Sequence, residues 1–67
     1  MDTICARVGF NIRKIREQKN LSQEQLANLA DVHRAYMGQI ERGEKNIGLK
    51  NLEKISKALK VNIKEFF

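Results

Sequence analysis

The chain has 67 residues, a length for which we expect one domain without a separate effector-binding module. Hydrophobic residues make up 42% and charged residues 31%, a balance typical of a globular chain and not of a disordered one. Thirteen Lys and Arg stand against eight Asp and Glu. The resulting net charge of +5 favours a polyanionic partner such as nucleic acid, although many basic proteins bind none.

Single copies of cysteine and histidine restrict the chemistry that the sequence can support. Cys5 has no second cysteine for an internal disulfide, and His33 lacks the partners of a zinc site or a catalytic triad. No paired carboxylates or Gly-rich phosphate loop indicate an enzyme, and we expect neither a cofactor nor a metal. The sequence has no signal-peptide run and no stretch near about 18 apolar residues, so we expect a cytoplasmic protein without membrane contact.

The apolar residues recur at helical spacing along the whole chain, which contains no proline. Val8, Ile12 and Ile15 predict a first helix, and the polar run 18–20 ends it, with Asn20 suited to a left-handed C-cap. No segment alternates apolar and polar residues for long enough to predict a strand. The predicted fold class is therefore all-α.

A capping box marks the start of the second predicted helix. Ser22 is followed three residues later by Gln25, a spacing at which each side chain can bond the backbone N–H of the other. Leu26, Leu29 and Ala30 then form the predicted apolar stripe of this helix. The second helix is therefore short and begins at a well-defined position.

A tight turn over residues 31–33 leads to a third predicted helix over roughly Arg34 to Arg42. Met37 and Ile40 face inward on this helix, and Gly43 follows it as a C-cap. The third helix is thus held by its inner face, and its outward residues are polar or small.

Two further helices complete the predicted fold. A polar loop over 44–48 precedes a fourth helix, whose apolar stripe is Leu49, Leu52, Ile55, Ala58 and Leu59. The run 62–65 resembles a second capping box and predicts a short terminal helix that carries Phe66 and Phe67. The predicted architecture is a compact domain of five helices.

The outward side chains of the third predicted helix carry groups that can recognise bases. Arg34 can donate two hydrogen bonds to guanine, Gln39 can pair with adenine, and Ala35 is small enough to meet a thymine methyl group. Tyr36 can bond a phosphate or stack on a sugar or a base. The same residues also suit a solvated helix face, and their chemistry alone does not choose between the two interpretations.

Several segments resemble the phage-repressor/Cro class (XRE-like) of helix-turn-helix domains. They are the Leu-Ser-Gln-Glu-Gln-Leu-Ala run at 21–27, Val32, the Ile-Glu-Arg-Gly run at 40–43, and 52–59. Within that class, residues 33–47 are most similar to the controller proteins of restriction–modification systems, and the closing residues resemble the C-termini of those proteins. The resemblance covers nearly the whole chain.

The resemblance implies a single lambda-repressor-like DNA-binding domain over residues 1–67, with the helix-turn-helix at about 22–42. It implies a transcription regulator that binds double-stranded DNA as a homodimer and controls its own gene and the endonuclease gene. RNA polymerase is a further candidate partner. A phage Cro-like repressor and the DNA-binding antitoxin of a toxin pair would have the same fold and site, so they remain alternatives. A module that binds only protein is a third alternative.

The resemblance also assigns roles to residues by position. Contacts with base edges fall to four residues on the third helix: Arg34, Ala35, Tyr36 and Gln39. Phosphate contacts fall to four residues at the edges of the motif: Gln23, Arg42, Lys45 and Asn46. Arg16 and Glu41 match an ion pair that ties the first helix to the third, a role for which the planar fork of arginine is suited.

The sequence departs from this family pattern at three positions. Asp31 stands where glycine is usual, although Asp tolerates the left-handed conformation. His33 stands where Ser, Thr or Asp usually caps the third helix and is a poorer cap. Ala35 replaces a common hydroxyl residue, so a hydrogen bond from this position is not expected.

The fourth and fifth predicted helices are expected to form the dimer interface. The candidate interface residues are Leu49, Leu52, Phe66 and Phe67. The two phenylalanine rings could instead close the core of the monomer. The sequence leaves both placements open.

Overall fold

The structure, a computed structural model, describes residues 3–67 and contains only helices and turns within them. Within these residues, four α-helices follow one another, and a single 3-10 turn, η1, comes after them. Their bounds are α1 Thr3–Gln18, α2 Gln23–Ala30, α3 Arg34–Glu41, α4 Leu49–Leu59 and η1 Ile63–Phe66. The all-helical prediction is confirmed over these residues, and none of their helices is long and apolar enough to cross a membrane.

The prediction of a fifth helix is wrong, because the last segment forms η1 instead of an α-helix. Its backbone bonds, from Glu65 N–H to Asn62 O at 2.9 Å and from Phe67 N–H to Lys64 O at 3.1 Å, span three residues each. The Asn62 side chain caps Lys64 N–H at 3.0 Å, one residue short of the spacing of a capping box. Short pieces of this kind favour 3-10 geometry.

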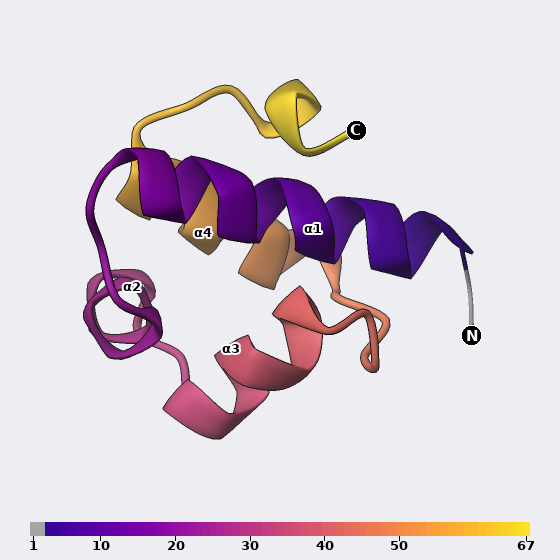
Figure 1. The fold of residues 1–67 in the computed structure, drawn as a ribbon, viewed down its shortest axis with the longest axis horizontal. Coiled ribbons are helices and arrows are strands. Elements are labelled where there is room, and N and C mark those ends of the chain that lie inside the picture. The colour runs from indigo at the N-terminus through magenta and orange to yellow at the C-terminus, as the bar shows by residue number, and fades with distance from the viewer. Residues whose placement is uncertain (1–2) are drawn as a thin grey trace.

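α1 crosses the front of the molecule with α4 behind it (Figure 1). α2 and α3 lie on one side of α1, and η1 lies on the other (Figure 1). The core fills the space between these elements, and its largest fully buried side chains are Ile12, Leu26, Met37, Ile40, Ile55, Leu59 and Phe66. The inward placement predicted for Met37 and Ile40 is confirmed.

The predicted apolar stripe of α2 is wrong at Leu29, whose side chain is 60% exposed. The buried residues of α2 are Leu26, Ala27 and Ala30. At about 100° per residue, these three share an arc of about 100° with Leu26 at one edge, and Leu29 lies about 60° outside that edge. A short helix against two neighbours buries only that arc, so Leu29 is left outside it.

Each α-helix ends with a residue in the left-handed conformation, as predicted for Asn20 and Asp31. The φ angles are 59° at Asn20, 57° at Asp31, 74° at Gly43 and 58° at Lys60. At every end, this residue donates its N–H to the carbonyl three positions back, and the next N–H reaches the carbonyl five positions back. This is the Schellman motif, and it satisfies carbonyls that the helix itself leaves free.

The predicted capping box at the start of α2 is confirmed. Gln25 N–H donates to Ser22 Oγ at 3.0 Å, and Ser22 N–H donates to Gln25 Oε1 at 2.8 Å. His33 precedes α3 without a side-chain capping bond, as its residue type predicted. α2 therefore starts at a fixed point, whereas α3 depends on packing for its position.

A backbone crossing of α1 over the end of α3 provides much of that packing. A Cβ atom on Gly9 would lie 2.1 Å from Ile40 O and 3.0 Å from Glu41 O, so only glycine permits this approach. Just beyond α3, a Cβ on Gly43 would lie 2.8 Å from Ala6 Cα. α1 thus rests directly on the C-terminal end of α3 and sets its orientation.

Candidate nucleic-acid interface

The inner side of α3 is buried, and its other side carries the four predicted base-reading residues. Met37 and Ile40 are 0% and 1% exposed. Arg34 and Ala35 are exposed at the first turn, and Tyr36 and Gln39 are half-buried. All four predicted residues therefore remain accessible on a helix whose position the core fixes.

A buried ion pair anchors the last residue of α3 to α1. Arg16 Nε donates to Glu41 Oε2 at 2.7 Å, and Arg16 Nη2 donates to Glu41 Oε1 at 3.0 Å. Arg16 Nη1 also donates to Leu21 O in the loop before α2. The hydrogen bond to Glu41 raises the pKa of Arg16 against the opposing effect of burial. The structure thus brings Arg16 and Glu41 together in the bidentate geometry that suits arginine.

Gln23, predicted to contact phosphate, takes part in the same network. Its amide Nε2 donates to Glu41 Oε1 at 3.0 Å, so Glu41 accepts hydrogen bonds from both α1 and α2. The network links three helices at one buried carboxylate. Sequence reasoning placed Gln23 at the start of α2 but did not find this contact, because its partner lies eighteen positions along the chain.

Arg42, a second predicted phosphate contact, is paired with an acid that sequence reasoning did not single out. Arg42 Nε and Nη2 donate to Glu44 Oε2 and Oε1 at 2.9 and 3.2 Å. Hydrogen bonding between them lowers the pKa of Glu44 and raises that of Arg42. Arg42 Nη1 lies 3.1 Å from the position that a Cβ on Gly38 would take, so this guanidinium passes over α3. The glycine makes room for it.

The other predicted phosphate residues, Lys45 and Asn46, are exposed in the loop between α3 and α4. Close to that loop, the structure joins α3 to α4 through a contact that the sequence did not reveal. Asn51 Nδ2 donates to the Tyr36 hydroxyl oxygen at 3.0 Å. Helical periodicity gives no signal for such a bond, because it links two separate helices.

The structure places the four candidate interface residues in two different environments. Phe66 is fully buried and Leu52 is 3% exposed, whereas Leu49 and Phe67 are 79% and 54% exposed. Phe66 therefore closes the core of the monomer. The other three line one apolar groove of about 190 Å³, whose walls are Ile4, Cys5, Val8, Asn46, Ile47, Leu49, Leu52 and Phe67.

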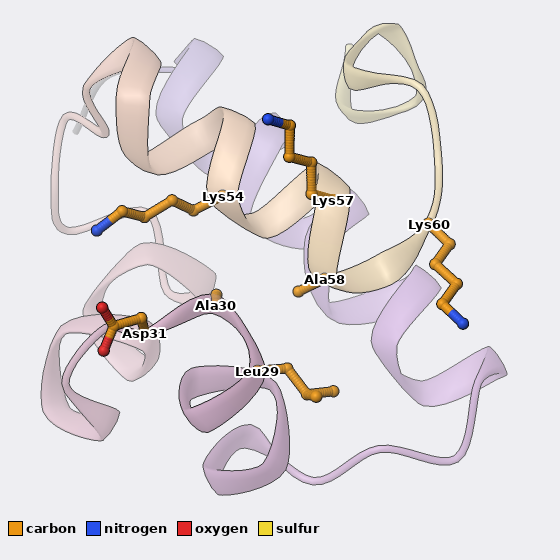
Figure 2. Close-up of a pocket in the computed structure, with 7 residues that line it drawn as sticks. All are labelled: Leu29, Ala30, Asp31, Lys54, Lys57, Ala58 and Lys60. Atoms are coloured by element: carbon orange, nitrogen blue, oxygen red, sulfur yellow. The ribbon is translucent and has the colours of Figure 1, made fainter.

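A second groove, of about 460 Å³, lies between the end of α2 and α4. Leu29, Ala30 and Ala58 form its apolar part, and Lys54, Lys57 and Lys60 stand around it with their ammonium groups pointing in different directions (Figure 2). Small-molecule sites usually have polar groups that converge on one point, and the lysine ammonium groups of this groove do not.

Within residues 3–67, no group of three or more His, Cys, Asp or Glu residues could hold a metal ion.

Comparison with known proteins identifies the class to which this fold and helix arrangement belong. The sequence pattern of the helix-turn-helix family matches residues 12–66, so the chain belongs to that family. Within the family, it is similar to the control protein C.BamHI of Bacillus amyloliquefaciens, with 53% identity over 58 residues that cover 85% of this chain and 72% of the relative.

Two further proteins extend this similarity along the whole chain. The control protein C.MunI of a Mycoplasma species is 43% identical over 68 residues, which cover 100% of this chain and 92% of the relative. The crystal structure of the restriction-modification controller protein C.AhdI from Aeromonas hydrophila has a TM-score of 0.96 and 38% identity, covering 98% of this chain and 100% of that one. The predicted resemblance to XRE-type domains and controller proteins is confirmed.

Proposed function

We propose that the chain is a sequence-specific transcription regulator that binds double-stranded DNA as a homodimer. In this proposal it is the controller of a restriction–modification system and regulates its own gene and the endonuclease gene. The main support for this proposal is the position of α3, which the core and the buried Arg16–Glu41 pair fix. The four residues predicted to contact bases stay accessible on this helix. The similarity to control proteins, among them a restriction-modification controller protein, supports the assignment to such a system.

The chemistry of α3 suits the major groove, which is about 12 Å wide and admits one helix. Arg34 at the first turn donates a fork of hydrogen bonds to guanine O6 and N7, and Gln39 pairs with adenine. Ala35 provides the surface for a thymine methyl group, and Tyr36 donates to a base or a phosphate. These four contacts would supply the sequence preference.

Phosphate contacts would flank that helix and set its register. Lys45 and Asn46 are free for this role in the exposed loop after α3. Arg42 can reach a phosphate by exchanging the Glu44 carboxylate for it, since both offer paired oxygens to the guanidinium. Gln23 would contact a phosphate from the start of α2 and, through its bond to Glu41, keep that contact in register with α3.

A homodimer would form over the apolar groove in which Leu49, Leu52 and Phe67 meet the start of α1. Leu49 and Phe67 are large apolar side chains with more than half of their surface exposed, and a second copy would cover them. In this proposal the protein acts in the cytoplasm, with RNA polymerase as a further partner and without a catalytic role of its own.

Selection of bound sequences from a random DNA duplex pool tests this function. A homodimeric reader should select two inverted half-sites about one helical turn, or 34–36 Å, apart. Sedimentation of the free protein should show a dimer, and a Leu49→Glu variant should shift it toward monomer while keeping its helical spectrum. Recovery of no preferred sequence, or of a single unpaired half-site by a well-folded monomer, would contradict the proposal.

A further inference from the structure

One contact, between Tyr36 and Asn51, links the outer side of α3 to the first turn of α4. The Asn51 amide donates to the Tyr36 hydroxyl oxygen at 3.0 Å, and both side chains are half-buried. The Tyr36 ring packs against the core, which fixes its direction. The position of Asn51 is also fixed, because the next residue, Leu52, is 3% exposed and anchors that turn of α4 in the core.

The direction of this hydrogen bond determines what the hydroxyl can offer to a ligand. A tyrosine hydroxyl has one proton to donate and two lone pairs that accept, whereas the amide nitrogen of asparagine only donates. Asn51 therefore occupies a lone pair of the Tyr36 oxygen and leaves the phenolic proton available. Accepting one hydrogen bond also polarises the hydroxyl and strengthens the bond that it donates.

We infer that Asn51 is a positioning residue that presents Tyr36 to DNA as a hydrogen-bond donor. The inference rests on the proposed DNA-binding function and deepens it. A donor at this position selects acceptors, which on DNA are phosphate oxygens, the N7 and O6 of guanine, the N7 of adenine and the O4 of thymine. It disfavours the amino groups of adenine and cytosine. Asn51, which the sequence resemblance assigns to no DNA contact, thereby contributes to specificity through Tyr36.

Replacement of Asn51 by aspartate reverses the polarity of the contact. An aspartate carboxylate only accepts, so the phenolic proton would turn toward it, and the outward side of Tyr36 would become an acceptor. The near-isosteric change lies in the first turn of α4, where a negative charge is favourable to the helix, so the variant should fold. Asn51→Ala removes the contact without reversing it and leaves the phenolic proton free.

The two variants separate the donor role from a purely structural one. If the bond only ties α3 to α4, Asn51→Asp retains a tie and should bind the operator better than Asn51→Ala. If Asn51 orients the Tyr36 proton, Asn51→Asp should be the weaker binder, by about tenfold, since a hydrogen bond to DNA is lost and its donor is masked.

The negative charge of the aspartate also repels DNA, and a double-mutant cycle removes this effect. Affinities for the sequence selected by the wild-type protein are measured for Asn51→Asp with and without Tyr36→Phe, with circular dichroism melts to confirm folding. We expect Asn51→Asp to lower the affinity for this DNA by a factor about tenfold larger in the protein with Tyr36 than in the Tyr36→Phe variant. An equal loss of affinity with and without Tyr36→Phe would overturn the role of Asn51 while leaving the DNA-binding function intact. Failure of the wild-type protein to select any sequence would overturn both.

Discussion

Removal of the Glu41 carboxylate should destabilise the fold more than most single substitutions. The Glu41 and Arg16 side chains are only 1% and 10% exposed, and Glu41→Ala would leave a buried guanidinium without its bidentate partner. Breaking a buried ion pair on one side costs about 3–5 kcal/mol. Arg16 keeps its bond to Leu21 O, and Glu17 lies 4.0 Å away, so we expect a loss near the lower limit, about 3 kcal/mol.

For a domain of this size, a loss of about 3 kcal/mol corresponds to a fall in Tm of about 12–24 °C. Urea denaturation followed by circular dichroism measures the loss in the free energy of unfolding, and a thermal melt measures the fall in Tm. The matched control is the double variant Arg16→Met with Glu41→Leu. Replacement of both partners by apolar residues leaves no unpaired charge, so the control should recover most of the lost stability. A loss below about 1 kcal/mol in Glu41→Ala, or a control that is less stable than the single variant, would refute this account of the pair.

Three further substitutions test features that the structure adds. Gly9→Ala should lower the free energy of unfolding by about 1–3 kcal/mol, because α1 and α3 must separate to admit the Cβ. An unchanged melting curve would contradict the close crossing. Lys60→Gly should raise the free energy of unfolding by about 0.5–1 kcal/mol, since glycine adopts the left-handed conformation of this position without the strain of a lysine. A lower free energy of unfolding would show that the lysine is not strained there. Glu44→Gln should strengthen binding to all duplexes several-fold by releasing Arg42, as fluorescence anisotropy would measure; weaker binding would instead mean that Glu44 orients Arg42 on phosphate.

Local patterns predicted the parts of the fold that depend on neighbours in sequence. The Ser22 capping box, the left-handed Asn20, and the inward Met37 and Ile40 all depend on spacings of a few residues. The left-handed conformation of Asp31 follows instead from the resemblance, which places it where glycine is usual. Such spacings act through the helix itself, so they are visible before any tertiary structure is known.

The errors and omissions arise where tertiary packing decides. Leu29 fits a helical stripe, but the arc that α2 buries is rotated away from Leu29 and toward Ala27. The last segment has the residues of a capped helix and forms a 3-10 turn. At the site, the four positions to which the resemblance assigns base contacts are accessible on α3, and the contacts themselves stay a prediction. The bond between Gln23 and Glu41 and the bond between Tyr36 and Asn51 join different helices, and no periodicity within one helix predicts such contacts.

The central claim, that the outward face of α3 reads bases, is tested most directly with Arg34→Ala on a panel of single-base variants of the selected operator. Arg13→Ala on α1 is the matched control, since it removes the same charge from an exposed position outside α3. We predict that Arg34→Ala keeps the free energy of unfolding within about 0.5 kcal/mol of the wild-type value. It should lose about 1–3 kcal/mol of discrimination at one base pair, which contains a guanine. The control should weaken all variants by a similar factor or leave them unchanged. Uniform weakening of every variant by Arg34→Ala, with discrimination intact, would contradict the claim.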